Sequence, residues 1–457
     1  MLLTRLKWDP ILTGDLAAEA VRVARDVSNR LTTPQVLSAA VSAANAQTAF
    51  PQTVHWAPYS VAQGYSGLAL LCSYLDACFP GESWDLKGKH DLENAARGAE
   101  CIPNLSIGIF SGLSGVAFAA WQLSREGTRY KKLLTELDSA IVPQAMTLAY
   151  RIQSNGSAAN VGDFDAISGL SGVGAYLLCR RDQPGVREGL FVIAAALAHL
   201  LADGSDGLPR WYTPPEQLYD DRMREIYPFG NLNCGLAHGV PSMLAFLSLC
   251  LKEDIVSPGL PEALECTTDW LCESRSDDEW GLNWPNAVSI EQVETASGPK
   301  LRVADAASAP YGGSRCAWCY GPPGIARALW LAGDALGRSD YREVALEAMY
   351  AVFRRPIEVR AIPSPTFCHG VAGLLQIALR FANDSGSPEI AQQCRKLTEQ
   401  LLARYAPGSL LGFRNLEIAD REVDQPGLLD GAPGVALVLL AAASEVEPTW
   451  DRLFLLS

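Results

Sequence analysis

Cysteine and histidine side chains stand directly before short glycine turns at three places in this sequence. They are Cys319, Cys368, His369 and His238, in the segments Trp-Cys-Tyr-Gly, Cys-His-Gly and Ala-His-Gly. Zinc prefers thiolate and imidazole ligands, and a catalytic zinc site keeps three protein ligands with a fourth position open. If the fold brings these turns together, Cys319, Cys368 and His369 supply such a set. The pattern therefore predicts one catalytic zinc ion per chain.

The glycine turns recur along the whole chain, and an apolar run follows each of them. Their first glycines are Gly64, Gly112, Gly169, Gly239, Gly321, Gly370 and Gly431. A second glycine stands three residues later in every copy except the fourth, which has Ser242 there. The spacing is irregular, roughly 50 to 80 residues, so variable loops must separate a constant unit. Helices that are apolar nearly all round are buried on every face.

Between the apolar runs lie more amphipathic helical stretches. They are Tyr130–Tyr150, Val186–Leu201, Asp340–Arg354 and Pro388–Tyr405. The alternation of amphipathic helix, loop, glycine turn and apolar helix predicts an all-α fold in which seven inner helices sit inside seven outer ones. We expect a closed α/α barrel, or toroid, that forms one domain over residues 1–457. Glycine pairs at the starts of inner helices allow neighbouring backbones to approach closely.

Composition excludes several classes of function. The chain has a formal net charge of −14 and is 48% hydrophobic, whereas a protein that binds nucleic acid usually carries a basic surface. No apolar run approaches the ~20 residues of a membrane-spanning helix, and the N-terminal residues lack the layout of a signal peptide. We expect a cytoplasmic protein that is not an integral membrane protein, and most of its 12 cysteines as reduced, buried thiols.

The residue before each first glycine occupies an equivalent position in the predicted barrel. In order, these residues are Gln63, Ser111, Ser168, His238, Tyr320, His369 and Asp430. Side chains at one end of the inner helices can converge on one pocket, where positive helix ends favour bound thiolates. Two of the five histidines fall at this position. Asp430 has an alternative role as a helix cap, and the ligand set leaves it out.

The other cysteines are weaker candidates for a catalytic or metal-binding role. Cys316 and Cys319 form a Cys-x-x-Cys pattern, which is typical of a redox pair or an alternative metal ligand. Cys316 has no counterpart in the next repeat, so we leave it out of the site, together with Cys234. The contexts of seven further cysteines predict simple core positions for Cys72, Cys78, Cys179, Cys250, Cys266, Cys272 and Cys394.

The longest connection between helical segments runs roughly from Asp277 to Gly313 and is rich in polar residues, glycine and proline. Long loops without regular structure are often functional in compact domains. Two interpretations remain open for it, a lid or substrate-binding loop and a solvated insertion.

Taken together, the seven glycine turns and the Trp-Cys-Tyr-Gly, Cys-His-Gly and Ala-His-Gly segments resemble the lanthionine synthetase C-like cyclases over nearly the whole chain. The resemblance implies an α/α toroid that holds one zinc ion through Cys319, Cys368 and His369. It also implies formation of thioether rings, by addition of peptide cysteine thiols to dehydroalanine or dehydrobutyrine.

The resemblance assigns catalytic roles to four further residues. His238 is the leading acid or base, and its ordinary pKa near neutrality suits proton transfer. Arg315, four residues before Cys319, would stabilise the developing oxyanion. Asp165 matches an acidic position and would pair with Arg315 or His238, or help to deprotonate the thiol. Tyr320 is a further candidate for contact with the enolate, and a structural ion pair is the alternative role for Asp165 and Arg315.

The implied partners are a dehydrated precursor peptide, a separate dehydratase and an exporter, with the chain acting as a stand-alone cyclase. Two other functions stay open. The same site would serve for addition of glutathione or another small thiol to dehydroamino acids in proteins. Alternatively, the toroid is a non-catalytic scaffold with structural zinc, in which the fourth zinc position is closed.

Overall fold

The computed structural model describes residues 8–154, 159–202, 204, 207–296, 298–310 and 314–457, and most of them are helical. The chain divides into two compact units, each assembled from segments that are distant in sequence. The first unit comprises Met1–Ser106, Phe110–Leu137 and Ala361–Asp451, and the second comprises Ile107–Ile109, Asp138–Arg360 and Arg452–Ser457. A single domain over residues 1–457 stays a prediction.

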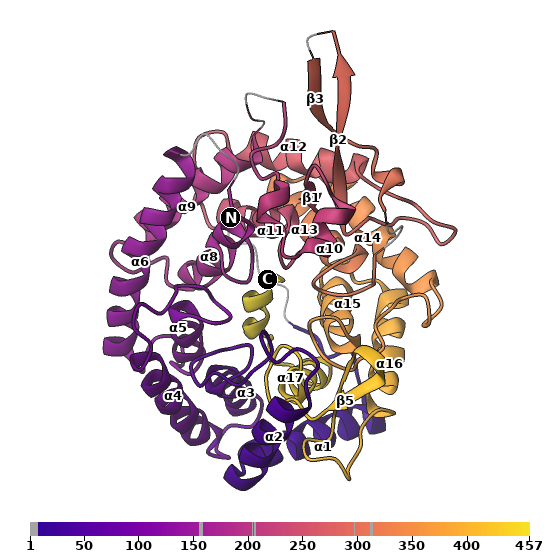
Figure 1. The fold of residues 1–457 in the computed structure, drawn as a ribbon. Coiled ribbons are helices and arrows are strands. Elements are labelled where there is room, and N and C mark those ends of the chain that lie inside the picture. Colours follow the sequence, from indigo (N-terminus) through magenta and orange to yellow (C-terminus); the bar gives the residue numbers. More distant parts are fainter. Residues whose placement is uncertain (1–7, 155–158, 203, 205–206, 297, 311–313) are drawn as a thin grey trace. The chain divides into compact units, whose positions relative to one another are not determined.

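The first unit is built mainly from eight described helices and one strand pair. Its helices are α1 (Gly14–Leu31), α2 (Pro34–Gln47), α3 (Tyr65–Cys78), α4 (Trp84–Glu100), α5 (Leu113–Gln122), α15 (Val371–Ser385), α16 (Pro388–Leu402) and α17 (Ala432–Ala443). Strands β4 (Asn415–Glu417) and β5 (Arg421–Val423) pair antiparallel. Helix α1 packs against α17 although almost the whole chain separates them, as the indigo and yellow ribbons of Figure 1 show.

The second unit contains most of α6 and the remaining α-helices and strands of the described chain. Its helices are α6 (Lys131–Ser154), α7 (Val161–Phe164), α8 (Leu170–Cys179), α9 (Val186–Leu201), α10 (Asp221–Ile226), α11 (Val240–Lys252), α12 (Leu260–Glu273), α13 (Pro322–Leu336) and α14 (Ser339–Arg354). Strands β1 (Asn231–Asn233), β2 (Ala287–Thr295) and β3 (Gly298–Val303) form an antiparallel sheet in the order β1-β2-β3.

All seven predicted glycine-turn helices are confirmed, and each begins directly after the first glycine of its turn. They are α3, α5, α8, α11, α13, α15 and α17. Gly321 shows why a side chain is excluded there, because its φ is +98° and a Cβ would lie 1.7 Å from the Arg315 carbonyl oxygen. A Cβ at Gly324, the second glycine of that pair, would lie 2.4 Å from the Trp318 carbonyl oxygen.

Backbone hydrogen bonds tie successive glycine turns to one another within each unit. In the first unit the Cys368 N–H donates to the Leu429 carbonyl (3.0 Å), and the Leu429 N–H donates to the Ala62 carbonyl (3.2 Å). In the second unit the Ala166 N–H donates to Ala237 (3.1 Å), and the Ala237 N–H donates to Cys319 (3.2 Å). The residues before the first glycines are therefore neighbours within their own unit.

The amphipathic helices also agree with the sequence pattern. In α16 the buried residues Ile390, Cys394, Leu397, Thr398 and Leu401 lie along one face, as the helical period requires. The core interpretation of Cys266 is wrong, because this residue of α12 is exposed. Its neighbours Thr267 and Thr268 are buried instead, and the apolar context of Cys266 did not reveal that it faces outward.

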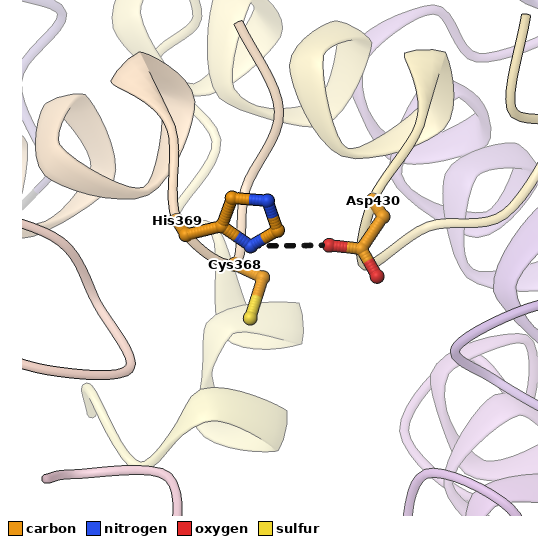
Figure 2. Close-up of side chains that lie close together, drawn as sticks. All are labelled: Cys368, His369 and Asp430. Carbon is orange, nitrogen blue, oxygen red and sulfur yellow. Dashed lines mark ion pairs between the residues drawn. The ribbon is translucent and has the colours of Figure 1, made fainter. Parts of the chain in front are cut away.

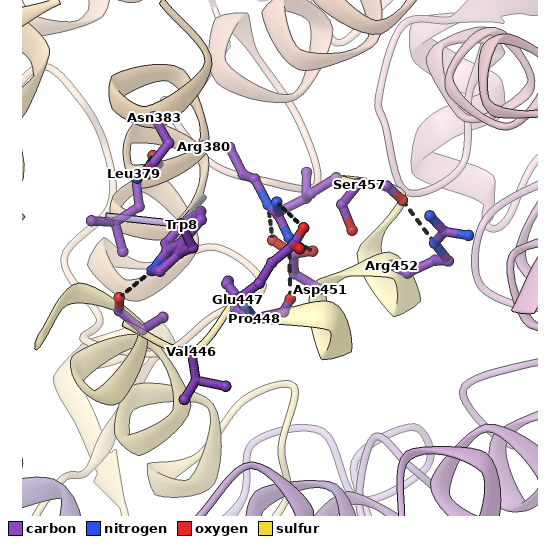
Figure 3. A network of polar contacts seen from close by, with 12 residues as sticks. Trp8, Leu379, Arg380, Asn383, Val446, Glu447, Pro448, Asp451, Arg452 and Ser457 are labelled. Carbon is purple, nitrogen blue, oxygen red and sulfur yellow. Dashed lines mark hydrogen bonds and ion pairs between the residues drawn. The ribbon is translucent and has the colours of Figure 1, made fainter. Parts of the chain in front are cut away.

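A buried ion pair fastens α15 to the segment that follows α17 in the first unit. Figure 3 shows the Arg380 guanidinium on the carboxylate of Asp451, with Nε–Oδ2 at 2.6 Å and Nη2–Oδ1 at 2.8 Å. The Trp8 ring lies 5.0 Å from the Arg380 Cζ atom, and Gln376 donates to Asp451 (2.7 Å). Removing one partner of such a pair strands a buried charge, at a cost of roughly 3–5 kcal/mol. The pair thus holds the helix that begins at the Cys368–His369 turn.

The C-terminal residues of the second unit anchor the Cys319 turn. The Trp318 indole Nε1 donates to the Phe454 carbonyl (3.0 Å), and Arg327 of α13 donates to the Leu456 carbonyl (2.7 Å). Both side chains are buried. The position of the thiol at residue 319 therefore depends on the last residues of the chain.

The long connection between α12 and α13 is partly regular rather than a structureless loop. Strand β2 pairs with β3 from Ile290↔Val303 to Thr295↔Gly298, and the pair extends away from the helices of its unit in Figure 1. Residue 297 and residues 311–313, within the stretch predicted as a lid or insertion, lie outside the described residues. Among the described helices, none has the length and apolar character needed to cross a membrane.

Candidate active site

Cys368, His369 and Asp430 come together in the first unit, at the starts of α15 and α17 (Figure 2). One ligand atom from each residue lies within 4.8 Å of the ligand atoms of the other two. The His369 Nδ1 atom lies 3.6 Å from Asp430 Oδ1. The glycine turns bring the residues together because the Cys368 N–H is bonded to the carbonyl that precedes Asp430.

The carboxylate of Asp430 is not fully satisfied by hydrogen bonds. Its Oδ1 atom is buried and accepts no hydrogen bond from any described residue. Burial raises the pKa of the Asp430 carboxyl, and the nearby His369 opposes that rise. A cation bound beside Asp430 would offset the charge of its carboxylate. Thiol, imidazole and carboxylate are all zinc ligands, so the donor set fits zinc.

Cys319, the third predicted zinc ligand, belongs to the second unit. It lies two residues before Gly321, the residue at which α13 is capped, and it is only 7% exposed. The residue therefore stands just before the N-terminus of α13.

Asp165 and His238 form a close pair in the second unit. The His238 Nδ1 atom lies 2.6 Å from Asp165 Oδ2. The other carboxylate oxygen, Oδ1, accepts hydrogen bonds from the backbone N–H groups of residues 167, 168 and 169 at 3.1, 2.7 and 2.8 Å. Because a carboxylate only accepts, Nδ1 of His238 carries the proton and Nε2 faces away from the pair.

Asp165 and His238 differ in how far their side chains are exposed to solvent. The Asp165 side chain is 3% exposed, whereas that of His238 is 43% exposed. A buried carboxylate that orients a half-exposed imidazole leaves one ring nitrogen open to a reacting molecule. This arrangement can transfer protons. Of the two partners predicted for Asp165, the structure gives His238.

Tyr320 is held by a residue that the sequence analysis did not single out. The Asn233 Nδ2 donates to the Tyr320 hydroxyl (3.1 Å), and Asn233 Oδ1 accepts from the Gly235 N–H (2.9 Å). Gly235 lies flat against the phenol ring, since a Cβ there would lie 2.6 Å from Tyr320 Cε1. Register places Asn233 opposite Ala287 in the β1–β2 pair. The side chain of residue 320 is thereby fixed.

Arg315 is exposed and forms no ion pair with a described residue, so its guanidinium is available to a negatively charged group. Cys316 and Cys234 are buried, and burial raises the pKa of Cys316 to about 11 and that of Cys234 to about 12. Arg355 and Arg360 lower the pKa of Cys316, but the effect of burial is larger. The omission of both from the ligand set stays a prediction.

Two members of these clusters were missed as functional residues. Asp430 had a signal, because it holds the position before a first glycine, as His238 and His369 do. Asn233 had a weaker one. It belongs to the strand that leads into the Ala-His-Gly turn, and no spacing rule identified it.

Comparison with known proteins shows extended similarity. A family model described as "Lanthionine synthetase C-like protein" matches residues 55–455. The nisin biosynthesis protein NisC of Lactococcus lactis subsp. lactis is 25% identical over 360 residues, which cover 77% of this chain and 78% of that protein.

A solved structure of nisin cyclase superposes with a TM-score of 0.73 at 22% sequence identity. The match covers 88% of this chain and 93% of that one. It confirms the predicted fold class, an all-α toroid of the α/α type.

The pairing of Asp165 with His238 predicts a single tautomer. In nitrogen-15 NMR of histidine-labelled protein, His238 should carry its proton on Nδ1, and Asp165→Asn should abolish that preference, because an amide no longer requires a donor. Asp163→Asn is the matched control, since Asp163 pairs with Arg151 at the surface (2.8 Å). An Nε2–H tautomer in the wild type would contradict the geometry.

Proposed function

The chain belongs to the lanthionine synthetase C-like family, and on that premise we propose that it is a zinc-dependent cyclase that forms thioether rings in a dehydrated peptide. The observation that carries the proposal is the concentration of zinc-type ligands and a carboxylate–imidazole pair at the glycine turns. The similarity to nisin cyclase supports a peptide substrate. A separate dehydratase would supply the dehydroalanine or dehydrobutyrine, and an exporter would remove the product.

Cys319, Cys368 and His369 would hold the zinc ion, with Asp430 beside His369. When bound, zinc supplies a Lewis acid that lowers the pKa of a substrate cysteine thiol and positions its sulfur. Asp430 Oδ1 lies 3.6 Å from His369 Nδ1, so its carboxylate would help to orient the imidazole, as carboxylates commonly do for metal-binding histidines.

Ring closure is an addition in which no atom is lost. The cysteine sulfur bonds to the β-carbon of the dehydro residue, and the electron pair of the C=C bond moves toward the carbonyl to give an enolate. The thiol has lost one proton and the α-carbon gains one. The product therefore has the same mass as the substrate, and the reaction needs no oxidant or reductant.

Protein side chains would transfer this proton and stabilise the negative charge of the enolate. Nε2 of His238 accepts the thiol proton and delivers a proton to the α-carbon, while Asp165 stabilises the imidazolium formed in between. The Tyr320 hydroxyl, held by Asn233, donates a hydrogen bond to the enolate oxygen. The exposed Arg315 guanidinium would add positive charge that stabilises the enolate.

Metal content tests the ligand set. Elemental analysis of the purified protein should find about one zinc per chain, and each of the changes Cys319→Ala, Cys368→Ala and His369→Ala should remove it. Asp430→Asn should weaken zinc binding by roughly 10- to 100-fold. Cys316→Ala, three residues from Cys319, is the control and should keep its zinc. Retention of full zinc by Cys319→Ala would contradict the proposed set.

Proton transfer by His238 predicts a large kinetic effect. His238→Gln should slow cyclisation by ~10²–10⁴-fold without loss of zinc, whereas His199→Gln on α9 should leave the rate unchanged. The substrate is a synthetic peptide with one cysteine and one dehydroalanine. Because ring closure leaves the mass unchanged, the residual thiol is counted by N-ethylmaleimide labelling in mass spectrometry.

The same assay with added glutathione distinguishes the alternative reaction. A product heavier by one glutathione, formed faster than the ring, would favour addition of a small thiol. An unchanged rate in His238→Gln would show that this residue does not carry the proton.

A further inference from the structure

A second feature of the first unit is a cavity of ≈ 520 Å³ that opens between α1–α2 and α3–α4. Its lining combines apolar side chains of α2 with an aromatic pair and an acidic residue of α4: Leu37, Val41, Trp56, Tyr65 and Asp91. The rings of Trp56 and Tyr65 meet edge to face, with centroids 5.2 Å apart and an interplanar angle of 85°. The lining thus offers an apolar wall, two aromatic rings and one carboxylate.

Asp91 carries a buried charge that the described residues leave without an ion pair. The residue is 7% exposed, and its described hydrogen-bond donor is the Cys72 thiol, with Sγ 3.8 Å from Oδ2. Lys87 also lines the cavity, but its Nζ lies 3.7 Å from the Trp84 ring centroid and 3.5 Å from Thr32 Oγ1. Burial raises the pKa of Asp91 to about 7. A buried carboxyl of this kind costs stability unless a cation joins it.

A second cavity of the first unit has no unpaired buried carboxylate of this kind among its described residues. It is lined by Arg414, Glu422 and Asp424, among others. There Arg414 already pairs with Glu422 (2.9 Å) and with Asp424 (3.3 Å). Of these two cavities, a cationic ligand would therefore stabilise the Asp91 cavity more.

The Asp91 cavity lies beside the glycine turns rather than on a remote surface. Tyr65 directly follows Gly64, and its N–H donates to the Pro58 carbonyl (2.9 Å) two residues after Trp56. The Ala62 carbonyl of the same turn accepts from Leu429, whose own carbonyl accepts from Cys368. Within this unit, two backbone hydrogen bonds therefore connect Ala62, three residues before Tyr65 of the cavity wall, to the candidate zinc ligand Cys368.

We propose that this cavity is a subsite for a lysine or arginine side chain of the peptide substrate. The aliphatic stem packs against Leu37 and Val41, and the cationic head meets the Asp91 carboxylate beside the faces of Trp56 and Tyr65, since aromatic faces attract cations. The assignment rests on the proposed function for the identity of the peptide. The recognition of a cation rests on the cavity alone.

Binding of small probes tests the recognition directly. The probes are the Nα-acetyl N-methylamides of lysine, arginine and norleucine, titrated into the full chain and followed by NMR. The lysine and arginine probes should bind at least tenfold more tightly than norleucine, which has the same apolar stem without the charge. Asp91→Asn should erase this preference. Asp85→Asn is the control, because Asp85 lies on the same helix but pairs with Arg129 (2.8 Å).

The variant should remain folded. At pH 8, above the raised pKa of about 7, the wild type carries the buried charge of Asp91. Asp91→Asn removes that charge and should melt at or above the wild-type temperature, so a loss of binding would not reflect unfolding. Equal binding of lysine and norleucine, or full preference in Asp91→Asn, would overturn the subsite.

Cyclisation kinetics separate this proposal from the proposed function. Two dehydrated peptides that differ by lysine or norleucine at one position outside the ring should differ about tenfold in KM, with similar kcat, because the contact is present in the ground state and the transition state alike. KM is measured for a series of peptides with the lysine at successive positions, to find the position that contacts the cavity. Equal KM at every position would overturn the subsite while cyclisation stands. No cyclisation of either peptide, with the lysine probe still bound, would overturn the proposed function instead.

Discussion

The close approach of backbones at the glycine turns is the constraint on which the rest of this structure depends. A Cβ at Gly321 would overlap the Arg315 carbonyl oxygen, and one at Gly324 would overlap that of Trp318. Free of these side chains, successive turns bond directly, as Cys368 does to Leu429 and Ala237 to Cys319. Each such hydrogen bond contributes only about 1 kcal/mol net, but it fixes which side chains can meet.

The buried helices behind the turns have a second consequence for the chemistry. The residues of α8 and α17 are buried along almost their whole length, and charged groups buried elsewhere in the described structure are commonly paired. Arg380 with Asp451 and Arg180 with Asp138 are examples. Against this background the exceptions stand out. Asp91 is buried and has no ion pair among the described residues, and Asp430 has only His369 beside it, at 3.6 Å; such carboxylates favour a cation.

Much of the fold could be predicted because its signals are local. Val186–Leu201 was predicted as a helix from periodicity and is α9 with the same ends. The first glycines marked the helix starts because the turn geometry excludes other residues. What failed depends on side-chain direction or on long-range pairing. Cys266 has apolar neighbours yet points outward. Strands β2 and β3 pair with each other in a polar segment whose composition resembles a loop.

The candidate site, like the fold, could be predicted from the sequence only in part. The alignment of the turns placed His238, Tyr320 and His369 at equivalent positions, and the structure gathers them with neighbours in their own units. The choice of His238 rather than Arg315 as the partner of Asp165 could not be predicted, because it depends on three backbone N–H groups that occupy Asp165 Oδ1. The contact of Asn233 with Tyr320 likewise requires the strand β1 to be formed.

The central proposal is that Cys319, Cys368 and His369 hold one catalytic zinc ion. X-ray absorption at the zinc K-edge of the purified protein tests it most directly, because sulfur and nitrogen ligands scatter at different distances. The account predicts two sulfur ligands at about 2.3 Å and one imidazole nitrogen at about 2.0–2.1 Å, with one sulfur lost in Cys319→Ser. A site with a single sulfur in the wild type would place the metal on Cys368, His369 and Asp430 alone and would contradict the account.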